Sequence, residues 1–228
     1  MKYIFSLCLI VCFLRCGAQN FNYHKDYDSI LKRTRDIKDN LYYRKLLGRF
    51  NKYDTSMTDA EVLALMIGYT GQPQFAPYSD LSTERKIYQL NDERKYDEVL
   101  EITDSFVITH PLSQKTLLER SYAFHKKGEN DSAANYAYRC KRILKAMAWS
   151  ADGLTPETAI FTVGPADGQD FITKYLEGEI GSMGSGRDSY GNFLDILTIK
   201  PKEKKSSYKM YFAIQPASSS LMQEFKTK

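Results

Sequence analysis

Tyr88-Gln89-Leu90 is followed 34 residues later by Tyr122-Ala123-Phe124. At the same offset, Asp97-Glu98-Val99-Leu100 is followed by Asp131-Ser132-Ala133-Ala134. The small residues of the second copy allow helices to approach one another closely. A sequence that repeats itself at such a period usually encodes one supersecondary unit per repeat. We therefore predict two successive helical hairpins between residues 83 and 150.

The period of 34 residues is that of tetratricopeptide repeats, in which each unit is helix, short turn, helix. Lys95-Tyr96 and Glu129-Asn130 would form the turns within the two hairpins, and His110-Pro111 would end the first unit. Two units are fewer than the roughly three that usually form a stable stack. We therefore expect the preceding helices or the C-terminal part of the chain to cap them.

The segment before the repeat contains a further helix and many aromatic residues. Thr58 and Glu61 have the spacing of a capping box, which predicts a helix that starts there and stops before Gly68. Tyrosines have an apolar ring and a polar tip, so they suit a binding surface or a buried joint equally well. The candidate binding residues of this aromatic segment are Arg49 and Asp54, which form a possible ion pair, together with Tyr69 and Tyr78.

The chain changes character near the Asp-Gly and Thr-Pro pairs of residues 151–156, which disfavour helix. Residues 159–163 form a short β-prone run, and residues 181–186 contain three glycines and read as a flexible stretch. Residues 192–199 and 207–214 read as the strands of an antiparallel hairpin around a basic turn, and residues 216–225 as a closing helix. The fold class predicted is α+β, with a helical region over residues 19–150 and a small antiparallel sheet within residues 151–228.

The densest polar cluster of the chain lies just before the first strand of this hairpin. Arg187, Asp188, Asn192 and Asp195 could bind a small ligand or a cation. The alternative is a polar turn in which Gly191 supplies a positive φ. The sequence leaves both interpretations open.

The sequence lacks recognisable motifs for catalysis, metals and cofactors. Asp167-Gly168-Gln169-Asp170 is faintly similar to a calcium loop but lacks the alternating ligands and the distal glutamate. The three histidines and the cysteines lack the spacing of zinc ligands, and no Gly-X-Ser-X-Gly or phosphate-binding glycine loop occurs. We therefore predict no cofactor and no metal, and the sequence favours a protein that is not an enzyme.

Residues 1–18 have the features of a secretory signal peptide. A short charged start precedes the apolar run Ile4 to Leu14, and small residues at Cys16 and Ala18 predict cleavage before Gln19. Eleven apolar residues are too few to span a bilayer, which needs roughly 20. Alternatively, Cys16 could be the acylated cysteine of a lipoprotein, although Arg15 is large and charged where such signals have a small residue. We expect a periplasmic or secreted protein, attached to a membrane only if Cys16 is lipidated.

Removal of this segment leaves 210 residues with 30 basic and 28 acidic side chains, a formal charge of +2. Such a balance argues against nucleic-acid binding, which relies on many contacts of lysine and arginine with phosphates. Cys140 would be the only cysteine left, so no internal disulfide could form. Its apolar helical surroundings predict a buried, unreactive thiol.

The chain resembles a family of exported proteins of Gram-negative bacteria, catalogued as a domain of unknown function, family four-nine-one-nine. The family commonly has a Tyr-Tyr-Gly-Tyr run where this chain has Met66-Ile67-Gly68-Tyr69. The resemblance implies an exported globular unit and no particular activity. It is carried by Tyr42-Tyr43, Leu46, Arg49-Phe50, Asp54, Thr58, Glu61, Gly68-Tyr69, Pro77-Tyr78, Asp152-Gly153, Ala159-Ile160-Phe161, Val163, Gly191-Asn192, Asp195-Ile196-Leu197 and Tyr211-Phe212.

The helical repeat and the absence of catalytic motifs together favour a module that binds a protein or peptide partner in the cell envelope. The partner would lie in the groove of the helical stack or on the aromatic segment. The alternative is a hydrolase or small-ligand-binding protein that uses the loop from Arg187 to Asp195.

Overall fold

The computed structural model describes residues 20–200 and 206–226. The predicted signal peptide and residues 201–205 of the predicted basic turn lie outside the described residues. Within the described ranges, no helix combines the length and the apolar character needed to cross a bilayer. The helices before residue 151 are α1 (Tyr23–Arg35), α2 (Tyr43–Asn51), α3 (Asp59–Thr70), α4 (Pro77–Asp92), α5 (Tyr96–Thr109), α6 (Gln114–Lys126) and α7 (Asn130–Ser150).

Strands and short helices make up the remainder of the chain. A short 3₁₀ turn (Pro156–Thr158) leads into β1, and α8 continues into one π-helical turn, Phe171–Tyr175. The other elements are β1 (Ile160–Phe161), α8 (Asp167–Asp170), β2 (Glu179–Arg187), β3 (Phe193–Lys200), β4 (Tyr208–Ala213) and α9 (Gln215–Lys226).

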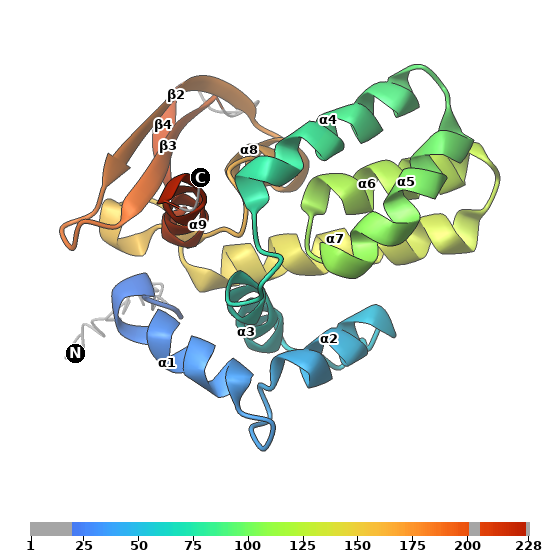
Figure 1. The fold of residues 1–228 in the computed structure, drawn as a ribbon. Coiled ribbons are helices and arrows are strands. Elements are labelled where there is room, and N and C mark those ends of the chain that lie inside the picture. Colours follow the sequence, from blue (N-terminus) through green and yellow to red (C-terminus); the bar gives the residue numbers. More distant parts are fainter. Residues whose placement is uncertain (1–19, 201–205, 227–228) are drawn as a thin grey trace, which may run out of the picture.

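The predicted repeat is confirmed by the geometry of its two inner turns. Arg94 and Gly128, which lie 34 positions apart, both have positive φ, at 62° and 82°. The amide of Lys95 donates a 2.8 Å hydrogen bond to the carbonyl of Leu90, as in a Schellman cap, and the second hairpin has the corresponding bond. The pairs α4–α5 and α6–α7 are therefore two copies of one helical hairpin, and they lie side by side in Figure 1.

Helix α3 lies at the centre of the helical region. Thr58 and Glu61 form the predicted capping box, and residues 62–69 are all buried, so only the two ends of this helix reach solvent. A Cβ atom at Gly68 would lie 3.0 Å from both the Thr34 Cβ and the Tyr43 ring. Glycine at this position thus allows α1 and α2 to pack closely on α3.

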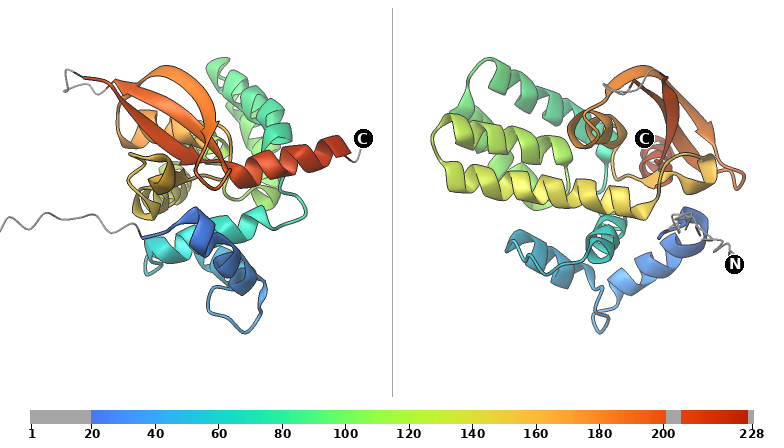
Figure 2. Two further views of the ribbon diagram at one scale, coloured as in Figure 1. Left: turned by 90° about the vertical axis from the view of Figure 1, so that its left-hand side faces the viewer. Right: turned by 180° about the vertical axis from the view of Figure 1, so that it is seen from behind.

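Helix α7 joins the second hairpin to a preceding helix and to the C-terminal part of the chain, the parts that were expected to cap the short array. It packs on α6 within the second hairpin, and its other contacts are with α3 and β1. Figures 1 and 2 show it as the long yellow helix that extends from the hairpins toward the sheet. The helices and the sheet share one core, in which Leu63 and Met147 of the helical region are buried in the same cluster as Phe161 and Phe212.

The sheet confirms the predicted α+β class and the predicted hairpin, but one of its strand pairs is parallel. Its strand order is β1-β4-β3-β2, and β3 and β4 pair antiparallel with Leu197 opposite Met210. Strand β1 pairs in parallel with β4, so the sheet is mixed and not wholly antiparallel as predicted. The parallel pairing is possible because the connection between them is long and passes through α8, β2 and β3. The closing helix is also confirmed, as α9.

The glycine-rich stretch of residues 181–186 was predicted to be flexible, and this prediction is wrong. These residues belong to β2, where Gly184 lies opposite Ile196 and Gly186 opposite Leu194 of β3. A Cβ at Gly186 would lie 2.9 Å from the Ile196 side chain. The partner strand therefore fixes the backbone of these residues and fills the space beside Gly186, a tertiary effect that local composition does not reveal.

Candidate functional site

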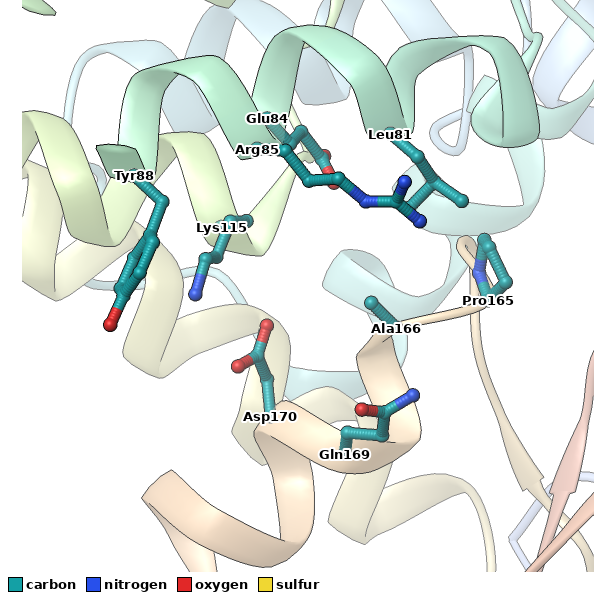
Figure 3. Close-up of a pocket in the computed structure, with 9 residues that line it drawn as sticks. All are labelled: Leu81, Glu84, Arg85, Tyr88, Lys115, Pro165, Ala166, Gln169 and Asp170. Carbon is teal, nitrogen blue, oxygen red and sulfur yellow. The ribbon is translucent and has the colours of Figure 1, made fainter. Parts of the chain in front are cut away.

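A cleft of about 390 Å³ lies where the helical hairpins meet the C-terminal part of the chain. One wall is formed by α4 and the beginning of α6, and the other by α8 and the loop that precedes it. Figure 3 shows the side chains that line it, and their positions on both walls make it a joint feature of the two regions. The lining residues are Leu81, Glu84, Arg85, Tyr88, Lys115, Pro165, Ala166, Gln169 and Asp170.

Charges of both signs face one another across this cleft. Lys115 of α6 and Asp170 of α8 point toward each other from opposite walls in Figure 3. Burial raises the pKa of the Asp170 carboxyl, and the Lys115 ammonium partly offsets this increase. The Lys115 nitrogen lies 4.4 Å from the centre of the Tyr88 ring and 3.6 Å from the Glu119 carboxylate. It is thus held at the rim by an aromatic face and an acidic neighbour.

Glu84 is the acidic residue on the wall formed by α4. Its carboxylate accepts a 2.6 Å hydrogen bond from the hydroxyl of Ser113, the N-cap residue of α6. Burial raises its pKa, and the nearby carboxylates of Asp80 and Asp170 raise it further against the effect of the Ser113 bond. The cleft therefore contains a carboxyl group that binds a proton more readily than an exposed glutamate does.

A narrow recess of about 30 Å³ adjoins the cleft on the side of Asp167. The Asp167 carboxylate accepts hydrogen bonds from the amides of Val163 (2.9 Å) and Gly164 (2.8 Å). Burial nevertheless raises its pKa to about 7, because desolvation outweighs these two bonds. Asp80 and His110 also line the recess, with 3.2 Å between the His110 Nε2 and the Asp80 carboxylate.

This arrangement offers a ligand both anionic and cationic partners, and burial raises the pKa values of its carboxyl groups. Clefts with perturbed carboxyl groups are the places where functional sites concentrate. In the part of the chain that the structure describes, no group of three or more histidine, cysteine, aspartate or glutamate residues is arranged to hold a metal ion.

Of the residues singled out from the sequence, Arg49 and Asp54 pair as expected. The Arg49 Nε lies 2.6 Å from the Asp54 carboxylate, and its guanidinium also bonds to Glu61 of the capping box. Hydrogen bonds from the Ser56 hydroxyl and from Arg49 lower the pKa of the Asp54 carboxyl to about 2. The network joins the end of α2 to the start of α3 and lies outside the cleft lining.

Tyr69 and Tyr78 lie in different environments. Tyr69 is only 3% exposed, packs edge-on against Phe75 at 5.5 Å between ring centres, and lines the recess beside Asp167. Tyr78 is half-buried, and Asp195 of β3 is the neighbouring charge that adds to the effect of burial on its pKa. Burial also raises the pKa of Asp195, to about 6. The structure thus brings together Tyr78 and Asp195, which the sequence assigned to separate candidate sites.

Arg187, Asp188 and Asn192 form the turn between β2 and β3. The Asp188 carboxylate accepts bonds from the amides of Tyr190 (2.9 Å) and Asn192 (2.8 Å) and from the Asn192 side chain (2.8 Å). Arg187 bonds to the Gly191 carbonyl and lies over the Phe193 ring. Gly191 has a φ of 85°, the positive value expected for a turn. The Asp188 carboxylate and one nitrogen of the Arg187 guanidinium are thus engaged in bonds within the turn itself.

Sequence reasoning missed the residues that form the cleft. Asp167 and Asp170 were considered only as calcium ligands, and Glu84 and Lys115 carried no motif. The sequence contained one indication of this surface, which is that Tyr88 and Tyr122 occupy equivalent positions in the two repeats. Both side chains are exposed in the structure. Only Tyr88 lines the cleft, since the C-terminal part of the chain covers the first hairpin at this point.

Comparison of the chain with models of known protein families gives a match. A model of the family described as Domain of unknown function (DUF4919) matches residues 28–223. The chain belongs to this family. The resemblance noted from the sequence is thereby confirmed, and the DUF4919 match includes both walls of the cleft. Neither the curated proteins nor the solved structures contained a match.

Proposed function

We propose that this DUF4919 protein is an exported binding module that holds a peptide segment of a partner protein in the cleft between α4, α6 and α8. The observation that carries the proposal is the lining of the cleft, which combines opposite charges, an exposed tyrosine and apolar carbon in one space of about 390 Å³. Cavities of this size suit a few residues of a polypeptide or a small molecule.

The lining offers a partner for each kind of group that a peptide presents. Lys115 and Arg85 can bind a carboxylate, and Asp170 and Glu84 can bind an ammonium or guanidinium group. The carboxamide of Gln169 can both donate to and accept from a peptide backbone. Apolar side chains of the peptide would contact Leu81, Pro165 and Ala166.

The wall of the cleft that α4 and α6 form is held in place before a ligand arrives. The Ser113–Glu84 bond joins α6 to α4, and the Ser79 hydroxyl donates a 2.8 Å bond to Glu224, which ties α4 to α9. Pre-organised walls lower the conformational entropy lost on binding. Because the cleft is already formed, the protein can bind an extended peptide segment without rearranging its own fold.

Export is the second part of the proposal and rests on the predicted signal peptide of residues 1–18. A module outside the cytosol would meet peptides and proteins of the cell envelope. The near neutrality of the mature chain is compatible with partners of either charge.

Site-specific photo-crosslinking in the native cell envelope tests the proposal. The matched positions are Tyr88, at the rim of the cleft, and Tyr122, its equivalent in the second repeat, which are 53% and 43% exposed. With p-benzoylphenylalanine at position 88, we expect a covalent adduct to one polypeptide, and mass spectrometry should map the link to a defined segment. The same photo-reactive residue at position 122 should give no such adduct.

The cleft charges supply the second arm of this experiment. Lys115→Ala and Asp170→Asn should each reduce the adduct at position 88 severalfold while the melting temperature stays close to that of the wild type. Excess unlabelled wild-type protein should compete with its formation. Equal crosslinking at positions 88 and 122, or an adduct at 88 that neither variant weakens, would overturn the peptide-binding proposal.

A further inference from the structure

A second groove, of about 440 Å³, lies between α1, the loop after α3, and α9. Segments from the beginning, the middle and the end of the chain meet there, so it exists only in the folded protein. Arg35 is the only charged residue of its lining, and the remainder consists of aromatic rings, prolines, hydroxyls and carboxamides. The lining residues are Tyr23, Tyr27, Arg35, Thr70, Gly71, Gln72, Pro73, Phe75, Pro216, Ser219, Ser220 and Gln223.

Hydrogen bonds between side chain and neighbouring element fix the walls of this groove. The Tyr27 hydroxyl and the Thr70 hydroxyl lie 2.7 Å apart and join α1 to α3. The Ser220 hydroxyl donates a 2.8 Å bond to the Phe75 carbonyl and joins α9 to the loop. The groove is therefore a pre-formed surface and needs little ordering when a ligand binds.

The hydrogen bonds within the protein determine which donors and acceptors of the groove remain for a ligand. The hydrogen of the Thr70 hydroxyl is donated to the Ile67 carbonyl, so Tyr27 donates to Thr70 and its oxygen can accept from a ligand. The Gln72 amide nitrogen bonds to the Gly68 carbonyl, and its carboxamide oxygen can accept as well. The Ser219 oxygen accepts from Gln215, which leaves its hydrogen for an acceptor on the ligand.

Arg35 adds a donor fork that is positioned by glycine. A Cβ at Gly71 would lie 3.1 Å from the Arg35 Nη2 and 2.9 Å from the Leu31 Cδ1. The Arg35 guanidinium therefore lies close to the backbone of the α3 C-cap, in space that a side chain at position 71 would crowd. Its planar donors suit a carboxylate or a pair of neighbouring hydroxyls.

We propose that this groove binds a saccharide. Its polar groups require a ligand that both donates and accepts, as a hydroxyl does, and its lining contains no carboxylate that would favour a cation. The apolar carbon of Phe75, Pro73 and Pro216 matches the C–H faces of a sugar ring. The Arg35 guanidinium binds vicinal hydroxyls or the carboxylate of an acidic sugar. This inference is independent of the peptide cleft.

Isothermal titration of the mature chain with four trisaccharides tests the proposal. The probes are cellotriose, maltotriose, chitotriose and trigalacturonic acid, the last of which distinguishes recognition of a uronate from recognition of hydroxyls alone. We expect saturable binding of at least one probe. Arg35→Ala should weaken that binding by at least about tenfold, the effect of losing a charge-assisted hydrogen bond, and Ser219→Ala should weaken it a few-fold.

Lys32→Ala is the matched control, because it removes a cation from the same helix at an exposed position outside the groove lining. It should leave saccharide affinity unchanged. Thermal unfolding of each variant shows that it is folded. The proposal would be overturned if none of the four probes bound saturably at concentrations up to about 10 mM. Binding that Arg35→Ala does not affect would overturn it as well.

Discussion

The Ser113 hydroxyl lies 2.6 Å from the Glu84 carboxylate and donates a hydrogen bond to it. The same hydroxyl oxygen accepts a 3.1 Å bond from the amide of Thr116 as the N-cap of α6. One side chain thus starts α6 and ties it to α4, the other helix of the same wall of the cleft.

Ser113→Ala should lower the free energy of unfolding by about 1–2 kcal/mol, because both the cap and the bond to Glu84 are lost. Urea denaturation followed by circular dichroism measures this change. Ser105→Ala is the control, since the exposed Ser105 hydroxyl bonds only to a carbonyl of its own helix at 3.4 Å. Equal effects of the two substitutions would show that Ser113 does not join the helices as described.

Asp167 should make the stability of the protein depend on pH. Burial raises the pKa of this carboxyl from 3.8 to about 7 in the folded state, so the folded chain binds a proton that the unfolded chain has released. The contribution of Asp167 is therefore fully present below pH 4 and is lost as the pH rises through 7. Burial raises the pKa values of Glu84 and Asp170 as well, and both act in the same direction.

Asp167→Asn removes this titration but keeps an oxygen that can accept from the amides of Val163 and Gly164. Between pH 4 and pH 8, the unfolding free energy of the variant should therefore fall less than that of the wild type. Urea denaturation across this range provides the measurement. Parallel stability curves for the two proteins would mean that Asp167 is already ionised at low pH in the folded state.

The equivalent residues Arg94 and Gly128, in the turns of the two repeats, allow the effect of a positive φ on stability to be tested within one protein. Gly128 has a φ of 82°, and a Cβ added there would meet nothing within 4 Å, so Gly128→Ala should cost about 1 kcal/mol from backbone strain alone. Arg94 adopts the same left-handed conformation at 62°, and Arg94→Gly should be neutral or stabilising by less than about 1 kcal/mol. Melting temperatures of both variants decide this, and a stabilising Gly128→Ala would contradict the geometry.

The mature N-terminus should be Gln19, in its free or cyclised form, when the protein is isolated from its native envelope. Intact-mass analysis distinguishes this product from a chain acylated at Cys16. A Cys16→Ala variant should be processed and released in the same way as the wild type. A diacylglyceryl mass increment on Cys16 would instead assign the protein to the lipoproteins.

Much of the fold follows from interactions between residues that are close in the sequence. The capping box of Thr58 and Glu61 and the 34-residue repeat depend on local hydrogen bonds and on helical periodicity. The hairpin of β3 and β4 depends on two apolar runs near one another in the chain. Patterns of this kind can be read without knowledge of the surroundings.

The candidate site could not be read in this way. The sequence left open whether Tyr69 belongs to a binding surface or to a buried joint, and the residue is buried. It also left open whether Asp188 binds a ligand or belongs to a polar turn, and its carboxylate accepts hydrogen bonds within its own turn. Asp167 lies beside Glu84 and Ser113 only because the C-terminal part of the chain packs against the first hairpin. Residue type alone does not distinguish these carboxyl groups from the many exposed ones.

The sequence by itself therefore determined the helical repeat, the hairpin, the closing helix and the α+β class, because each rests on contacts within a short stretch of chain. The tertiary structure alone decided that β2 is a strand, that β1 pairs in parallel, and where the clefts lie. It also decided which carboxyl groups have a raised pKa, since the pKa of Asp167 depends on burial by residues distant in sequence. Burial is a property of the assembled fold, and no local pattern specifies it.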